Sequence, residues 1–169
     1  VPQAHIVAHA TDLGHAAQRG AEMLALMLAT GTISRLLFGW ISDRIGGLAT
    51  MVLGSSLQAM TLFCFMFADA LTALYLMAGL FGLSQGGIVP SYAIVIRNYF
   101  MPTQIGWRFS LVLSATFLGM ALGAWVAGLL YDLTGSYRAA FINAVGVNIA
   151  HMFIAWWLLR RSRLEFISR

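Results

Sequence analysis

Residues 109–131 read FSLVLSATFLGMALGAWVAGLLY and include no charged side chain. A helix rises about 1.5 Å per residue, so a helix over this stretch is long enough to cross the roughly 30 Å hydrocarbon core of a bilayer. A strand of a membrane β-barrel needs only about ten residues of alternating polarity, and this continuous apolar stretch does not alternate. The stretch therefore predicts a transmembrane α-helix.

The rest of the chain repeats this pattern. Charge-free stretches of similar length occupy residues 45–68, 70–96 and 139–159. A further apolar span, residues 16–38, is interrupted by three charged side chains, those of Arg19, Glu22 and Arg35. Each of these spans has the length that a membrane-crossing helix requires.

The segment before the first span, residues 1–12, is apolar but too short to cross a bilayer. It has neither an initiator methionine nor a basic region in front of it, so we do not interpret it as a signal peptide. We expect the sequence to begin within a helix, as a fragment of a longer chain would. The fold prediction is an all-α, polytopic membrane protein with the C-terminal part of one helix and five full transmembrane helices, over residues 1–12, 16–38, 48–68, 71–96, 109–131 and 139–159.

The composition agrees with a membrane protein. Hydrophobic residues make up 60% of the chain and charged residues 9%, whereas a soluble domain carries about 25% charged residues. The net charge of +4 comes from ten arginines with no lysine. These arginines fall mainly in connections and near the C-terminus, which argues against nucleic-acid binding. The single cysteine, Cys64, excludes an internal disulfide and a cysteine metal cluster.

The arginines also predict an orientation. If successive spans alternate in direction, two arginines fall on one side of the membrane, Arg19 and Arg138. The other eight fall on the opposite side, which we therefore expect to be cytoplasmic together with the C-terminus of this multi-pass protein. These eight are Arg35, Arg44, Arg97, Arg108, Arg160, Arg161, Arg163 and Arg169.

Two spans carry packing signals. In the span 109–131, small residues recur at four-residue spacing, which places them on one helix face and predicts a close contact seam with a neighbouring helix. They are Ala115, Gly119, Gly123 and Ala127. In the span 71–96, Pro90 follows Gly86 and Gly87, and this pattern predicts a bend. Gln85 and Tyr92 flank the bend and are candidate cavity-lining residues, although ordinary kinked packing remains the alternative.

A sequence motif lies where the span 16–38 ends. Residues 31–47 read GTISRLLFGWISDRIGG, and the pattern Gly39-x-x-x-Asp43-Arg44-x-Gly46 resembles the cytoplasmic loop signature of the major facilitator superfamily. Gly39 would allow a neighbouring helix to approach, and Gly46 a sharp reversal. Asp43 would face the amides of a helix N-terminus and Arg44 would bind a partner carboxylate. Such a cluster could lock one conformation and release it in another, and a simple solvated loop is the alternative.

Three further motifs extend the resemblance along the chain: Ala10-Thr-Asp-Leu-Gly14, Gly86-Gly87-x-x-Pro90 and Leu130-Tyr-Asp132-x-x-Gly135-Ser-Tyr137. In this order they resemble the C-terminal six-helix half of monocarboxylate-transporter-like members, including oxalate/formate antiporter relatives. The resemblance implies a twelve-helix transporter, and therefore a missing N-terminal six-helix half as the partner of this chain. It implies no catalytic residues and no cofactor.

Arg35 is the leading candidate for substrate binding. The pattern Arg35-x-x-x-Gly39 is similar to one whose arginine pairs with the substrate carboxylate in these branches. A guanidinium in an apolar helix is costly, so Arg35 should face a cavity or a partner, unless it reaches the nearby membrane surface. Some relatives have an aspartate where this chain has Gly31, and oxalate-type relatives add a lysine to the helix that here spans 109–131. With one cation, a monoanion is the expected substrate.

His5 and His9 share one face of the first segment and could bind substrate or relay a proton. Two histidines without a third ligand are a weak metal site, so no metal is predicted. The sequence thus predicts a secondary transporter for a small organic anion, with a proton or a counter-anion as coupled partner and no nucleic acid. A drug/proton antiporter or sugar porter of the same superfamily, a haem-binding redox subunit and an assembly subunit remain open alternatives.

Overall fold

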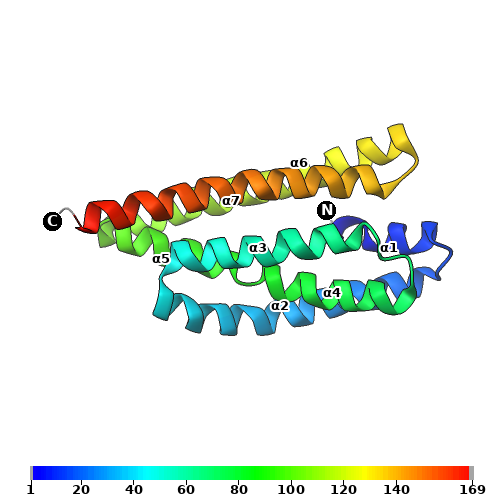
Figure 1. The fold of residues 1–169 in the computed structure, drawn as a ribbon, viewed down its shortest axis with the longest axis horizontal. Helices are drawn as coiled ribbons and strands as arrows, with labels where there is room; N and C mark the ends of the chain where they lie inside the picture. The colour runs from blue at the N-terminus through cyan, green and yellow to red at the C-terminus, as the bar shows by residue number, and fades with distance from the viewer. Residues whose placement is uncertain (1, 168–169) are drawn as a thin grey trace.

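The computed structural model describes residues 2–167, with side chains described up to Arg161. Within these residues the chain forms seven α-helices and one short 3₁₀-helix and contains no strand (Figure 1). The helices are α1 (Pro2–Asp12), α2 (Ala17–Ile45), α3 (Gly47–Phe65), α4 (Leu71–Gln85), α5 (Ile88–Tyr99), α6 (Ile105–Thr134) and α7 (Tyr137–Ile167), and the 3₁₀-helix η1 (Pro102–Gln104) precedes α6.

The structure confirms the all-α, polytopic fold. Among the described residues, five segments are long and apolar enough to cross a membrane, and each coincides with a predicted span. Helix α1 has 11 residues, too few to cross by itself. The membrane-length segments are Ala17–Ile45, Gly47–Phe65, Leu71–Tyr99, Pro102–Thr134 and Tyr137–Arg161.

The predicted bend in the segment Leu71–Tyr99 is confirmed. Helix α4 ends at Gln85 and α5 begins at Ile88, so Gly86 and Gly87 interrupt the segment. Pro90 has no N–H to donate to the carbonyl of Gly86, four residues earlier. Hydroxyl groups bind carbonyls around the break: Ser91 donates to the carbonyl of Gly87, and Ser34 of α2 donates to that of Leu83.

The helices run along the long axis of the bundle. In Figure 1, α6 and α7 lie along one side, α2 and α4 along the other, and α3 between them. Helix α1 occupies only one half of the bundle length, and its first residues lie near the middle. The main hydrophobic core lies in this half, where α1, α2, the end of α3, α4 and the start of α7 meet, and includes Ile6, Met23, Leu74, Phe65 and Phe141.

The closest helix contact joins α2 to the end of α4 and the start of α5. A Cβ atom on Gly82 would collide with the carbonyl of Met27, and one on Gly86 with the carbonyl of Gly31. A Cβ atom on Gly87 would collide with the ring of Phe38. Glycine is therefore required at Gly82 and Gly86, because the obstructing carbonyls belong to the backbone of α2, and at Gly87 any larger residue would displace the side chain of Phe38.

The predicted seam on α6 has a different environment. Ala127 is buried and Ala115 is exposed, and a Cβ atom on Gly119 or Gly123 would meet no other atom within 4 Å. Within the described chain these glycines make no close helix contact, and they line a cavity instead. Contact of this face with another chain stays a prediction.

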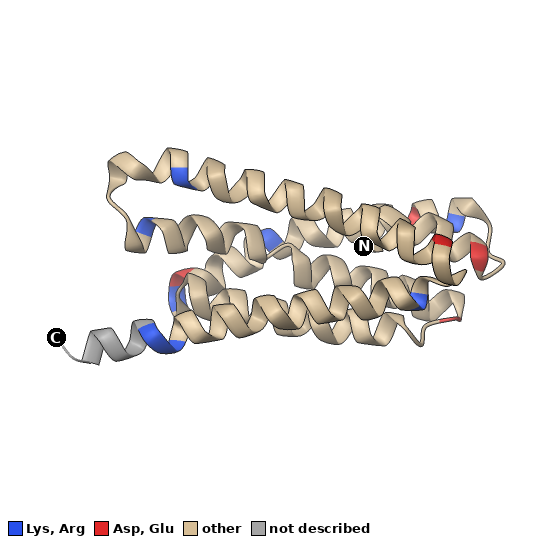
Figure 2. Cartoon of the chain, turned by 90° about the horizontal axis from the view of Figure 1, so that it is seen from above, with Lys and Arg blue, Asp and Glu red and all other residues tan. Residues whose placement is uncertain are grey.

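Charged residues gather at the two ends of the bundle, and most of the length between them is uncharged (Figure 2). We call one end the arginine-rich end; it holds the α2–α3 and α5–α6 connections and the last turns of α7. At the opposite end, α1 meets α2, α3 meets α4 and α6 meets α7. Large apolar side chains such as Leu36 and Leu133 are exposed between and near these ends, as expected of a surface that faces lipid.

Candidate functional site

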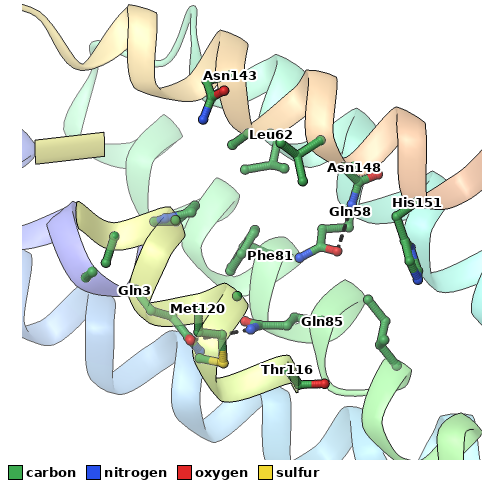
Figure 3. Close-up of a pocket in the computed structure, with 18 of the residues that line it drawn as sticks. Gln3, Gln58, Leu62, Phe81, Gln85, Thr116, Met120, Asn143, Asn148 and His151 are labelled. Atoms are coloured by element: carbon green, nitrogen blue, oxygen red, sulfur yellow. Dashed lines mark hydrogen bonds between the residues drawn. The ribbon is translucent and has the colours of Figure 1, made fainter. Parts of the chain in front are cut away.

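A cavity of about 450 Å³ lies inside the bundle between α1, α3, α4, α5, α6 and α7 (Figure 3). Its polar wall consists of neutral side chains, mostly amides, and none of the residues that line it carries a formal charge. Gly119 and Gly123 of α6 leave space on one side. The polar lining residues are Gln3, Gln58, Gln85, Tyr92, Thr116, Asn143, Asn148 and His151.

Pairs of side chains connect the helices around this cavity. Asn148 of α7 donates to Gln58 Oε1 of α3 over 2.9 Å, and Gln85 of α4 donates to Gln3 Oε1 of α1 over 3.4 Å. These pairs leave two buried acceptors, Gln85 Oε1 and Asn148 Oδ1, without a partner among the described residues. A buried acceptor without a hydrogen bond costs about 1–3 kcal/mol. Both residues line the cavity, so a small rotation of either amide would present an acceptor to water or to a solute that carries donors.

Two of the five predicted substrate contacts, Gln85 and Tyr92, line this cavity. The other three, Arg35, His5 and His9, do not. The structure thus brings the two residues flanking the bend together with six other polar side chains, and it places the arginine and the two histidines elsewhere.

The two histidines of α1 contact α6 and α7. The Nε2 atom of His5 lies 3.0 Å from the carbonyl oxygen of Ala124 in α6. The ring of His9 packs edge-on against Tyr137 and Phe141 of α7. His9 also lines a smaller cavity of about 200 Å³ at the end opposite the arginine-rich end. Among the side chains that the structure describes, no three of the kinds that bind metals are placed to share an ion.

Arg35 lies on α2 beside the tight seam. Ser34, the preceding residue, is buried against Gly86, so Arg35 lies about 100° around the helix from this contact and at the depth of the α4–α5 break. Arg35 is exposed, and in residues 2–161 no hydrogen-bond or ion-pair partner holds its guanidinium. Gly31 and Gly39 precede and follow it by one turn, and a Cβ atom on Gly39 would meet nothing within 4 Å. Space is therefore open on the Gly39 side of this cation, whereas Gly31 packs against α4.

The loop motif reverses the chain at the arginine-rich end. Gly46 has a φ of 84°, which favours glycine, and its N–H donates to the carbonyl of Ser42 over 2.9 Å. The close approach predicted for Gly39 occurs at Gly47, where a Cβ atom would lie 2.9 Å from the carbonyl oxygen of Ser91 in α5. Asp43 is exposed, and the guanidinium of Arg44 lies 3.6 Å over the ring of Trp40. No described carboxylate binds Arg44, so its pairing in another conformation stays a prediction.

The motif, the charge-free spans and the bent helix have a counterpart among known proteins. The profile of the Major Facilitator Superfamily matches residues 4–165, which is almost the whole chain. The chain belongs to the major facilitator superfamily. It is therefore an integral, multi-pass membrane protein of a superfamily of transporters.

Within this superfamily the chain is similar to monocarboxylate transporters. Monocarboxylate transporter 13 of Rattus norvegicus is 31% identical over 85% of this chain and 34% of its own length. Probable anion transporter 5 of Arabidopsis thaliana is 32% identical over 57% of this chain and 23% of its own length. The multidrug export protein EmrB of Haemophilus influenzae is 22% identical over 95% of this chain and 31% of its own length. The chain spans about a third of the length of the monocarboxylate transporters it matches.

For this superfamily member, sequence reasoning identified only part of the cavity wall. Asn148 donates a hydrogen bond to Gln58, which pairs α7 with α3. Their position on the cavity was missed, as was that of His151, whose Nδ1 atom lies 3.0 Å from the hydroxyl of Ser55. A usable signal was present: polar residues recur along α7 at about every second turn, at Asn143 and His151, with Asn148 between them.

We expect Gln58 and Asn148 to contribute jointly to the stability of the α3–α7 contact. A double-mutant cycle with Gln58→Leu and Asn148→Leu should give a coupling energy of about 0.6–1.7 kcal/mol, the range for hydrogen bonds between membrane helices. Equilibrium unfolding of the parent chain and the variants in mixed micelles measures this coupling energy. Asn143→Leu is the matched control, because Asn143 lines the same cavity without a recorded partner, and a cycle of Asn143 with Gln58 should show no coupling. Equal coupling in both cycles would contradict this assignment.

Proposed function

We propose that this chain is one half of a secondary transporter for small organic anions, with monocarboxylates as the substrate class. A second six-helix half forms the opposing wall, and rocking of the two halves exposes the substrate to each side of the membrane in turn. The observation that carries the proposal is Arg35, an unpaired guanidinium within an apolar span, in a chain similar to monocarboxylate transporters.

The energetics of Arg35 support an anionic substrate. Inserting a guanidinium near the centre of a membrane helix costs about 2.5–3.5 kcal/mol. An arginine at such a position is therefore expected to bind a ligand or a partner residue. Its planar fork donates two parallel hydrogen bonds to a carboxylate, a geometry that an ammonium group cannot reproduce. The partner half completes the site around this side chain. The substrate carboxylate then neutralises the cation that this chain contributes.

The charge of the site favours a monoanion. The cavity lining holds no charged residue, and the membrane-crossing part of α6 between Arg108 and Asp132 has none. A dicarboxylate would leave its second negative charge without a partner on this half. Gly31 stands one turn before Arg35, where it supplies no carboxylate for proton transfer. The coupled ion, whether a proton or a counter-anion, therefore binds other groups.

The neutral cavity is suited to the uncharged part of the substrate. Gln85 lies next to Gly86, which packs against Ser34, so the cavity wall and Arg35 are at the same depth in the membrane. We assign substrate contacts to Gln85 and Tyr92, and contacts near one mouth of the pathway to His5 and His9. The arginine-rich end and the C-terminus face the cytoplasm in this proposal, because cytoplasmic connections carry the excess of arginine.

A substrate panel tests the proposal. Proteoliposomes that contain the transporter of which this chain is one half are assayed for uptake of lactate, succinate, a hexose and a lipophilic cationic drug. We expect saturable uptake of lactate, competition by other monocarboxylates and no competition by succinate. Saturable uptake of the drug or the hexose without uptake of lactate would overturn the proposal and favour a drug antiporter or a sugar porter.

A further inference from the structure

The smaller cavity, at the end opposite the arginine-rich end, has a charged rim. Its volume is about 200 Å³, and the charged side chains that line it are those of Asp12, Asp69 and Arg138. All three residues are exposed, so they form the part of the lining that faces solvent. Two carboxylates and one guanidinium leave one negative charge in excess. The cavity therefore favours a cation.

His9 forms the buried part of this lining. Only 9% of its surface is exposed, and its Nε2 atom is buried without a hydrogen-bond partner among the described residues. The ring is held between those of Tyr137 and Phe141, whose centroids lie 5.4 and 5.3 Å from its own. Buried nitrogen atoms of this kind nearly always have a partner. An unpaired Nε2 atom on a cavity with excess negative charge is thus free to bind a cation.

A proton suits this site better than a metal ion. A metal ion in a protein is usually held by three or four ligands, and among the described side chains no three of the suitable kinds are placed together. A proton needs one acceptor with a lone pair, and imidazole gains and loses a proton near neutral pH. Burial opposes a positive charge on His9, whereas the carboxylates of Asp12 and Asp69 favour it.

The other titratable and charged groups at this end lie on several elements. On α1, the ring of His5 lies 5.4 Å from that of Tyr137 of α7, which also lines the cavity. On α2, which packs against α1, Arg19 pairs with Glu22. The remaining groups are His15 after α1, Cys64 of α3, Tyr75 of α4, and Tyr131 and Asp132 of α6, and none of them lines the cavity. Of the lining residues, His9 is therefore the one that ordinarily titrates near neutral pH.

We propose that His9 is a proton-binding site and that its proton is the ion coupled to substrate transport, a role that rests on the proposed function. The proton leaves a water molecule at the rim and bonds to the Nε2 lone pair, which gives His9 a positive charge and a new N–H donor. The carboxylate of Asp69 or Asp12 turns inward to accept from it. Asp69 can do so because its pair with Arg138 is weak: the two groups are 4.0 Å apart and their side chains 65% and 66% exposed.

Helix α1 connects this proton site with the substrate cavity. Gln3 stands six residues before His9 on the same helix, about 9 Å along its axis, and lines the larger cavity. There it accepts the hydrogen bond of Gln85, which we assign to substrate binding. A movement of α1 on proton binding would therefore change the substrate site. By linkage, the substrate would change the affinity for the proton by the same factor.

Histidine-selective 15N NMR of the purified chain in micelles tests the site without any substrate. The His9 signal is identified by its loss in H9Q, and we expect it to titrate with a midpoint between about pH 5 and 8. The variant D12N/D69N should lower this midpoint by about one pH unit. E22Q is the matched control, because it removes a carboxylate at the same end that does not line the cavity, and it should leave the midpoint unchanged. A His9 signal that stays constant across this pH range would overturn the site.

Uptake by proteoliposomes that contain the transporter tests the coupling. In the parent, an outside-acid pH gradient should raise lactate accumulation at least about fivefold. H9Q should lose this response but still exchange lactate when the pH is equal on both sides. H15Q is the matched control, because His15 lies at the same end and does not line the cavity, and it should keep the response.

The two assays separate this proposal from the transport function. Lactate uptake that ignores the gradient in the parent, or an equal response in H9Q and the parent, would overturn the coupling role. A parent that takes up no lactate while His9 titrates as expected would contradict the transport function and support the proton site. Thermal unfolding first compares each variant with the parent. If H9Q does not fold, D12N/D69N replaces it, since both residues are exposed, and should move the pH dependence of uptake to lower pH.

Discussion

Replacing Arg35 with alanine is expected to lower monocarboxylate uptake at least about a hundredfold while the protein remains folded and inserted. Hydrogen bonds to charged groups contribute about 1.5–3 kcal/mol each, and a bidentate carboxylate loses two of them. The protein itself should not be destabilised, because Arg35 has no partner among the described residues and its removal relieves a costly charge. Loss of transport without loss of stability distinguishes a substrate-binding residue from a structural one.

Two further variants sharpen this experiment. Arg35→Lys keeps the charge but not the planar fork, so it should retain a small part of the uptake, with a raised half-saturation concentration. Arg97→Ala is the matched control, because Arg97 is another exposed arginine on a membrane segment near the arginine-rich end. Uptake in proteoliposomes, normalised to inserted protein, measures all three. If Arg35→Ala transports at the parental rate, Arg35 does not bind the substrate.

The number and positions of the spans could be predicted from sequence because bilayer thickness sets the length of a charge-free stretch. The bend at Gly86–Gly87 could also be predicted from the sequence, because Pro90 removes a specific backbone hydrogen bond. Both features depend on local sequence and on a fixed property of the membrane. They need no knowledge of which helices are neighbours.

The remaining features depend on how the helices are rotated against one another. Small residues permit a close contact without requiring one, which is why Gly119 and Gly123 border a cavity while Gly82 and Gly86 form the tight seam. The partner of Arg44 illustrates the same limit. The sequence predicts a partner carboxylate, which none of the described residues supplies in this conformation, where the guanidinium lies over the ring of Trp40. Trp40 stands one turn earlier on the same helix, a spacing that the sequence shows.

The α2–α4 seam leads to the second large expected effect. Gly82→Ala should lower the free energy of unfolding by about 3 kcal/mol or more, or prevent folding. Alanine is a better helix former than glycine by about 1 kcal/mol, but its Cβ atom would collide with the carbonyl of Met27 and the hydroxyl of Thr30. The hydroxyl could rotate, whereas the carbonyl belongs to the backbone of α2. The two helices would therefore have to separate, and the Ser34 bond to the Leu83 carbonyl would lengthen with them.

Gly123→Ala is the matched control, because it is the same substitution within a membrane-crossing helix at a position where a Cβ atom meets nothing within 4 Å. It should leave stability unchanged or raise it by up to about 1 kcal/mol. Thermal unfolding in detergent micelles, followed by tryptophan fluorescence, compares the two variants. Equal stability of Gly82→Ala and Gly123→Ala would mean that α2 and α4 are not in close contact. The depth match between Arg35 and the neutral cavity, which relies on that contact, would then be lost as well.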